Sequence, residues 1–348
     1  MAKKNNGALC PRVDIGGQAV LDGVMMKSPD AVAVAVRRPN GDIVVKREDY
    51  VSPAKKHKWM GLPFIRGSVN MVQMMGLGMR VLEDSMKMSG QEEEEPSKFE
   101  KWLAKKLGKS IDKVVMAVAI VMALALSIGL FVLLPNTVIK LFPEGGGNGT
   151  LLLKNLTSGV IRIALLIAYI SLVGRIPDMR KTFQYHGSEH KTVYCHEHSL
   201  PLTPKNAQQF STLHPRCGTS FLLLTFFLSI LFYSVIDVVV LEWTGFNLGE
   251  HYLWRVLSRI ALLPCVAGIS YEVLKGLAHA ENPVTRFLRW PGLQMQRLTT
   301  RQPSDDQCEV AIASMNAALN GLPEGEKTEE GWVILRAGRN TETENENQ

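Results

Sequence analysis

Four long apolar runs constrain the fold of this chain more than any other feature. Each holds about 20 residues, and a helix of that length crosses a hydrocarbon core of roughly 30 Å. The first run contains no charged residue, whereas each of the others contains at least one. The runs cover residues 114–134, 151–173, 219–241 and 252–274. We therefore predict a mainly α-helical membrane protein with about four transmembrane helices, in contact with a lipid bilayer.

Charged side chains inside these runs need partners. The second run contains Arg162, the third contains Asp237, and the fourth contains Arg255 and Arg259. A central arginine costs about 2.5–3.5 kcal/mol on insertion scales, so Arg162 is expected to face other helices. Because a lone charge in the membrane costs more than a pair, Asp237 is predicted to lie near one of the three arginines. For the second run, a buried helix of a soluble domain is the alternative.

Loop charges predict the orientation of the helices. Lysine and arginine are frequent in residues 98–113, in 174–218 and after 274. They are rare in 135–150 and absent from 242–251. Since cytoplasmic loops carry the excess of cations, both termini and the 174–218 loop are expected in the cytoplasm. The same rule explains the net charge of +6, so nucleic acid is not required as a partner.

A small α+β region is predicted before the first run. Residues 31–37 alternate alanine and valine, residues 39–42 have a turn composition, and residues 43–45 are apolar, which together predict a β-hairpin. Residues 62–88 are expected to form a methionine-rich helix. The glycine-containing segment 16–26 indicates a tight turn beside a strand, with a ligand-binding loop as the alternative.

Changes of composition divide the chain. Residues 91–96 form an acidic linker. The five cysteines include no Cys-x-x-Cys pair and lie mostly on the predicted cytoplasmic side, which favours free thiols. The N-terminus has no apolar core of a signal peptide. The predicted parts are an N-terminal cytoplasmic α+β domain (1–97), a four-helix membrane domain (98–278) with a histidine-rich cytoplasmic loop (174–218), a cytoplasmic helical segment (279–320) and a largely disordered tail (321–348).

The pattern His186-x-x-Glu189-His190 carries the clearest chemistry. On a helix, His186 and His190 share one face and can bind one cation, and imidazole suits zinc. Glu189, one residue away, can act as a general base on a bound water. The order of these residues matches a known metallopeptidase pattern, although a pattern of five residues also arises by chance.

Further candidate ligands lie near the same predicted membrane face. His214 and Cys217 come just before the third apolar run. A rise of about 1.5 Å per residue places Glu272 at the cytoplasmic end of the fourth run. Catalytic zinc is held by three protein ligands and keeps an open position. We therefore predict a divalent metal, with zinc the best fit, bound by residues from the set His186, His190, Glu272, His214 and Cys217. Polar residues of a membrane-surface loop are the alternative.

Several segments together resemble a known family. They are residues 16–26, 185–191, 214–221, 268–272 and 291–300. The chain resembles the YqhQ-like family of bacterial polytopic membrane proteins over roughly residues 14–318. Ser188 departs from the small alanine expected there. The resemblance implies a multi-pass protein of the bacterial inner membrane and a metal-dependent enzyme, with no substrate implied.

Two hypotheses follow from the sequence. The first is a membrane-embedded metal-dependent hydrolase that acts at the cytoplasmic membrane face through Glu189, on an unknown substrate. The alternative is a non-enzymatic membrane regulator, or a component of a transport system, in which the intramembrane charges form a structural polar cluster. Intramembrane charges are functional suspects by default, which favours the alternative. The sequence indicates no protein partner and leaves a homo-oligomer open.

Overall fold

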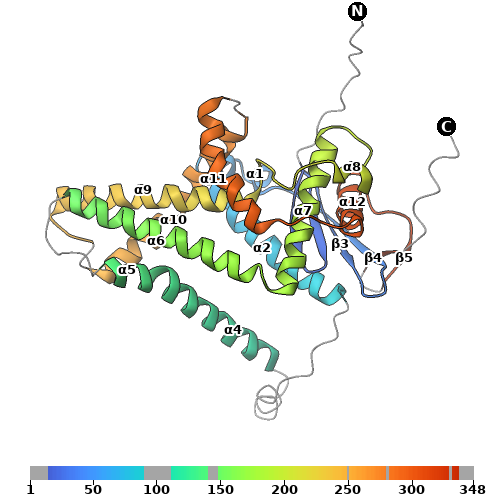
Figure 1. Ribbon diagram of the computed structural model, residues 1–348, viewed down its shortest axis with the longest axis horizontal. Helices are drawn as coiled ribbons and strands as arrows, with labels where there is room; N and C mark the ends of the chain where they lie inside the picture. The colour runs from blue at the N-terminus through green and yellow to red at the C-terminus, as the bar shows by residue number, and fades with distance from the viewer. Residues whose placement is uncertain are drawn as a thin grey trace, which may run out of the picture. The chain divides into compact units, whose positions relative to one another are not determined.

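The computed structural model describes residues 15–89, 111–139, 148–248, 251–279, 282–328 and 331–336 (Figure 1). The chain splits into two compact units. The first unit comprises residues 1–90, 172–224 and 267–348, and the second comprises residues 91–171 and 225–266. The predicted linker at 91–96 lies outside the described residues.

The first unit contains a six-stranded antiparallel sheet. Its strand order is β1-β2-β3-β4-β6-β5. The predicted hairpin is confirmed, with Ala35 opposite Val45. The glycine-containing segment forms a second hairpin, closed by Asp22 at a φ of 53°. The strands are β1 (Gly16–Val20), β2 (Gly23–Lys27), β3 (Ala31–Arg37), β4 (Ile43–Asp49), β5 (Glu326–Lys327) and β6 (Val333–Leu335).

Two short strands lie within the tail that we predicted to be largely disordered. Strand β6 pairs with β4, and β5 pairs with β6. Trp332 is only 2% exposed and belongs to the apolar cluster on one face of the sheet. The apolar segment from Trp332 to Leu335 buries enough surface to offset the entropy lost on ordering, which an acidic segment cannot do. Residues 337–348, which include the acidic end, lie outside the described part of the chain.

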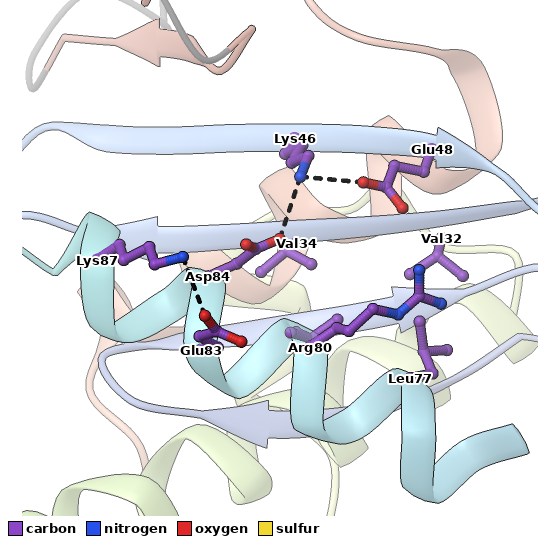
Figure 2. Close-up of a pocket in the computed structure, with 10 residues that line it drawn as sticks. Val32, Val34, Lys46, Glu48, Leu77, Arg80, Glu83, Asp84 and Lys87 are labelled. Carbon is purple, nitrogen blue, oxygen red and sulfur yellow. Dashed lines mark hydrogen bonds and ion pairs between the residues drawn. The ribbon is translucent and has the colours of Figure 1, made fainter. Parts of the chain in front are cut away.

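Helix α2 (Ile65–Met88) covers one face of the sheet. Val32, Val34 and Val36 of β3 point to this face and form a cluster with Leu77 and Val81 of the helix. A groove of about 270 Å³ lies between α2 and strands β3 and β4 (Figure 2). Six of its ten lining residues are charged, and five of these six form ion pairs: Lys46 lies 3.1 Å from Asp84 and 3.0 Å from Glu48, and Lys87 lies 3.1 Å from Glu83. The groove is therefore an ion-pair network.

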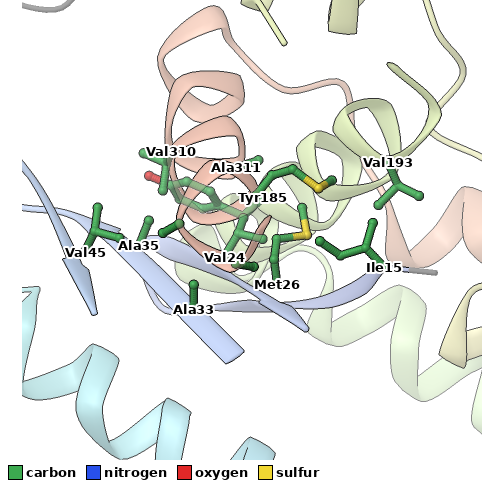
Figure 3. Packing of buried hydrophobic residues seen from close by; sticks show 13 residues of the cluster. Ile15, Val24, Met26, Ala33, Ala35, Val45, Tyr185, Val193, Val310 and Ala311 are labelled. Carbon is green, nitrogen blue, oxygen red and sulfur yellow. The ribbon is translucent and has the colours of Figure 1, made fainter. Parts of the chain in front are cut away.

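Helices α7 (Pro177–Glu197) and α12 (Asp305–Asn320) pack on the other face. Ala33 and Ala35 of β3 point to this face, and Tyr185 of α7 is buried against them (Figure 3). Because both faces of the sheet are covered, the side chains of β3 from Ala31 to Val36 are all small and apolar. Tyr185 directly precedes His186, so the same packing fixes the rotation of α7 and thereby the direction of the histidine face.

Four helices are long and apolar enough to cross a membrane, as predicted from the four runs. The candidate spans are Val118–Ile139, Leu152–Val173, Gly218–Thr244 and Leu253–Leu277. The first span includes helix α4 (Ile111–Ile128), a π-helical turn η3 (Gly129–Leu133) and helix α5 (Leu134–Ile139), and the others lie in α6 (Asn148–Val173), α9 (Gly218–Thr244) and α10 (Tyr252–His279). The protein is therefore a mainly helical, multi-pass membrane protein with an additional antiparallel sheet.

The predicted pairing of the intramembrane aspartate is confirmed. The Asp237 carboxylate lies 2.6 Å from the guanidinium of Arg259 and 3.8 Å from that of Arg255. Asp237 is 1% exposed, so its charge is compensated inside the second unit rather than by solvent.

Candidate metal centre

Helix α7 carries the motif His186-x-x-Glu189-His190 and confirms its predicted helical geometry. The imidazole ring centroids of His186 and His190 lie 4.5 Å apart. Pro177 occupies the first turn, where its missing N–H costs nothing. His190 is 2% exposed, and His186 is also largely shielded. The two rings therefore meet in a space from which most water is excluded.

Cys217 completes a group of three possible ligands. One ligand atom each of His186, His190 and Cys217 lies within 4.8 Å of the other two. The His186 Nε2 atom is 3.2 Å from Cys217 Sγ. At this distance the thiol can donate a proton to the imidazole, and both atoms can equally turn lone pairs toward a shared cation. Cys217 directly precedes α9, so the group lies at one end of a candidate span.

Backbone carbonyls orient both imidazoles. The Nδ1 atom of His186 lies 2.9 Å from the carbonyl oxygen of Thr299, and Nδ1 of His190 contacts the carbonyl oxygen of Thr212 at short range. A carbonyl only accepts hydrogen bonds, so each Nδ1 carries the proton. In the neutral imidazole this leaves each Nε2 with a free lone pair. Ligating histidines in metal sites are commonly held in this way.

One buried nitrogen supports a metal at this position. Among the described residues, the Nε2 atom of His190 is buried and has no hydrogen-bond partner. Leaving such an atom unsatisfied costs about 1–3 kcal/mol. Two imidazoles and a thiolate suit zinc, which accepts nitrogen and sulfur ligands in a tetrahedral arrangement. The residues present therefore fit a divalent metal, and the group of His186, His190 and Cys217 can hold one.

Glu189 is fixed beside this group by the first strand. Its Oε1 atom accepts a hydrogen bond of 3.0 Å from the backbone N–H of Gly17, and its Oε2 atom lies 3.9 Å from His186 Nε2. A side chain at position 17 would place its Cβ 2.9 Å from the Cγ atom of Glu189. The glycine thus allows strand β1 to approach Glu189 closely. The interpretation of segment 16–26 as a turn or a ligand-binding loop did not predict this contact.

Gly187 permits another close approach. A Cβ atom at this position would collide with the carbonyl oxygen of Arg301. The backbone N–H of Arg301 donates to the carbonyl of Phe183 at 2.8 Å, so residues 299–301 lie directly on α7. This contact brings the Thr299 carbonyl to His186. Gly187 weakens the helix locally, but it allows the site to close.

His214 lies beside the group of three, and its ring nitrogens have other partners. Its Nε2 atom is 3.2 Å from Glu197, and its Nδ1 atom accepts from the backbone N–H of Arg216 at 3.3 Å. Burial lowers the pKa of His214 to about 4, against the opposing effect of the Glu189 charge. Its ring centroid lies 5.7 Å from that of His190. His214 therefore packs on a ligand candidate as a neutral ring.

Gln296, which the sequence reading did not single out, holds the loop before Cys217. It lies in helix α11 (Pro283–Thr299) and is fully buried. Its amide accepts from the backbone N–H of His214 and donates to the carbonyl of the same residue, both at 2.7 Å. It also donates to Ser220 at 2.7 Å. These bonds fix the loop that positions Cys217.

Glu272 does not join the group. Its carboxylate forms two bonds to the Arg66 guanidinium, at 2.7 and 2.6 Å, and accepts from the backbone N–H of Phe64 at 3.3 Å. The helix rise that predicts the depth of Glu272 does not predict the partner that its side chain contacts. A Cβ atom on Gly67 would lie 2.6 Å from Tyr271. The segment 268–272 of α10, which contains Glu272, therefore packs against the start of α2.

Comparison with known proteins confirms the resemblance at the level of the family. Residues 62–321 match the family model described as "Protein of unknown function (DUF1385)". The curated "Uncharacterized protein YqhQ" of Bacillus subtilis (strain 168) is 33% identical over 311 residues, which cover 87% of this chain and 92% of the relative. No solved structure matches. Neither description states an activity, so the chemistry must be argued from the side chains.

Proposed function

We propose that this chain, which belongs to the DUF1385 family, is a metal-dependent hydrolase with its centre at His186, His190 and Cys217. The observation that supports the proposal is the orientation of the two imidazoles. Each gives its Nδ1 proton to a backbone carbonyl, and the Nε2 atom of His190 is buried without a partner among the described residues. A divalent metal, zinc before others, is the ligand that satisfies this arrangement.

Glu189 is proposed as the general base. A bound zinc would supply Lewis acidity and lower the pKa of a coordinated water toward neutrality. The Gly17 N–H holds one oxygen of Glu189, while the other oxygen lies on the side of His186 Nε2. Glu189 is 6% exposed, so a proton that it accepts is kept from bulk water. Proton transfer by a carboxylate positioned in this way accounts for typically 10²–10⁴-fold in rate.

The centre is proposed to face the cytoplasm. Strand β4, before the first span, pairs with strand β6, after the last, so the two ends of the chain lie on one side of the membrane. The positive charge of the cation-rich loops favours assigning that side to the cytoplasm. The substrate would then approach from the cytoplasm or along the inner leaflet of a bacterial inner membrane.

Cysteine labelling tests this orientation. We expect a membrane-impermeant maleimide to modify an Asn247→Cys variant in intact cells, because residue 247 lies in a predicted external loop. A Lys205→Cys variant should react only after lysis. Labelling of residue 247 only after lysis would reverse the topology and place the centre outside the cytoplasm.

Glu189→Gln tests the proposed chemistry. We expect the purified variant to retain its metal but to lose about 100-fold or more of any hydrolysis measured on chromogenic esters, amides and phosphoesters. The control is Glu309→Gln, which removes a half-exposed carboxylate on α12 paired with Arg37. Loss of the metal from the Glu189 variant would make Glu189 a ligand, and unchanged hydrolysis would exclude it as the base.

A non-enzymatic role is the second candidate, and the buried pairing of Asp237 with Arg259 and Arg255 favours it. In that case the metal would be structural. Stoichiometric metal with no hydrolysis in the same assays, together with loss of folded protein on metal removal, would support this role over the hydrolase.

A further inference from the structure

A second polar cluster lies within the membrane-spanning helices and is independent of the metal centre. It consists of Arg162 and Asn155 on α6, Asp237 on α9, and Arg255 and Arg259 on α10. We refer to these five residues as the arginine cluster. All five belong to the second unit.

A single carboxylate oxygen compensates two of the arginines. The Oδ2 atom of Asp237 accepts from Arg259 at 2.6 Å and from Asn155 at 3.1 Å, and it lies 3.8 Å from Arg255. Arg255 donates to the amide oxygen of Asn155 at 2.8 Å. The Asn155 amide therefore bridges Asp237 and Arg255 by hydrogen bonds. Arg162 forms no bond in this network.

The third arginine leaves the cluster with excess positive charge. Arg162 follows Asn155 by seven residues, about two helical turns, and therefore lies on the same face of α6 as Asn155. Among the described residues, the Nε atom of Arg162, the Nη1 atom of Arg259 and the Oδ1 atom of Asp237 are buried without a hydrogen-bond partner. Both ion pairs described in the second unit go to Asp237. Like charges repel strongly where water is scarce, so three arginines around one aspartate need a further anion.

We infer that the arginine cluster binds a phosphate group through Arg162, Arg255 and Arg259. Guanidinium groups bind such anions with paired N–H donors in a plane, and unpaired buried donors are available on two of the three. Asn155 and Asp237 then position Arg255 and Arg259 through the bonds that they form with these two arginines.

The depth of the cluster allows two sources for the anion. Arg162 lies deepest, about 21 Å from the start of α6 at a rise of about 1.5 Å per residue. With the same rise, Arg255 lies about 5 Å from the start of α10, and Asp237 about 10 Å from the end of α9. Both helix ends adjoin the loop around residue 247, near which lipid headgroups lie. The anion is thus a lipid phosphate from that leaflet or a soluble phosphate that enters from the same side.

Nanodiscs of defined composition test the inference. The full-length protein is placed in discs of phosphatidylcholine alone or with phosphatidylglycerol, and the midpoint of thermal unfolding is measured with and without inorganic phosphate. A lipid source predicts that phosphatidylglycerol raises the midpoint for the wild type but not for Arg162→Gln. A soluble source predicts that phosphate produces this difference instead. Arg175→Gln, which removes an exposed arginine outside the cluster, should behave as the wild type.

Asp237→Asn distinguishes anion binding by the cluster from a purely structural role. It also tests the inference if the Arg162 variant fails to fold. Removing the one negative charge should raise the affinity for the effective anion by about tenfold, although the protein itself becomes less stable. Unfolding midpoints of the wild type that respond to neither additive, an equal loss of response in Arg175→Gln, or an Asp237→Asn variant without gain in affinity would each overturn the inference.

Discussion

Purified protein with His186→Ala, His190→Ala or Cys217→Ser is expected to retain less than about a tenth of the zinc bound by the wild type, for which we expect about one equivalent. Each change removes one of the three ligand candidates that lie together among the described residues. Two remaining ligands cannot hold zinc in the tetrahedral site that its affinity depends on. Metal content is measured by mass spectrometry after dialysis, and affinity by competition with a chromophoric chelator.

Two further variants make this prediction specific. His198→Ala removes an exposed imidazole from the end of the same helix and should leave the metal in place. Glu272→Gln should also keep the metal, because Arg66 already binds that carboxylate. Zinc loss from the Glu272 variant equal to that from the His186 variant would favour the ligand set predicted from the sequence over the group of three. Retention of zinc by all three ligand variants would refute the proposed metal centre.

Gly187→Ala is expected to lower the free energy of unfolding by about 3 kcal/mol and to weaken zinc binding as well. The new methyl group collides with the Arg301 carbonyl, which is backbone and cannot rotate away. Residues 299–301 must then move off α7, and the Thr299 carbonyl loses its contact with His186. Chemical denaturation gives the stability, and chelator competition gives the affinity.

Gly76→Ala is the matched control for this substitution. Gly76 lies within α2, and a Cβ atom there would meet no atom within 4 Å. Alanine in place of glycine inside a helix stabilises it by about 0.5–1 kcal/mol. The two substitutions are chemically identical and should shift stability in opposite directions. A similar loss in both would mean that Gly187 has no special role in closing the site.

The sequence predicted the features that depend on local periodicity. The four spans, the hairpin and the shared face of His186 and His190 all follow from side chains that recur at helix or strand spacing. Features that depend on the meeting of distant segments could not be predicted. The carbonyl of Thr299 reaches His186 across 113 residues, and the N–H of Gly17 reaches Glu189 across 172.

Two further differences have the same origin. Glu272 bonds to Arg66 rather than to the histidines, since helix rise carries no information about lateral neighbours. Strand β6 has only three residues, too few for a clear alternating pattern, and becomes ordered through pairing with β4. Every residue has a backbone carbonyl, so the amino-acid sequence does not indicate which carbonyl will accept a hydrogen bond. The carbonyl acceptors of both imidazoles were therefore not predicted.

The pairing of β4 with β6 has a consequence for the synthesis of this protein. While the ribosome is still translating the membrane helices, β4 has no partner on the side that β6 will occupy. An unpaired strand edge invites association with other chains. All four spans must be inserted before the last strand of the nascent chain leaves the ribosome. During that interval, the unfinished sheet would need a chaperone or the membrane surface to shield its edge.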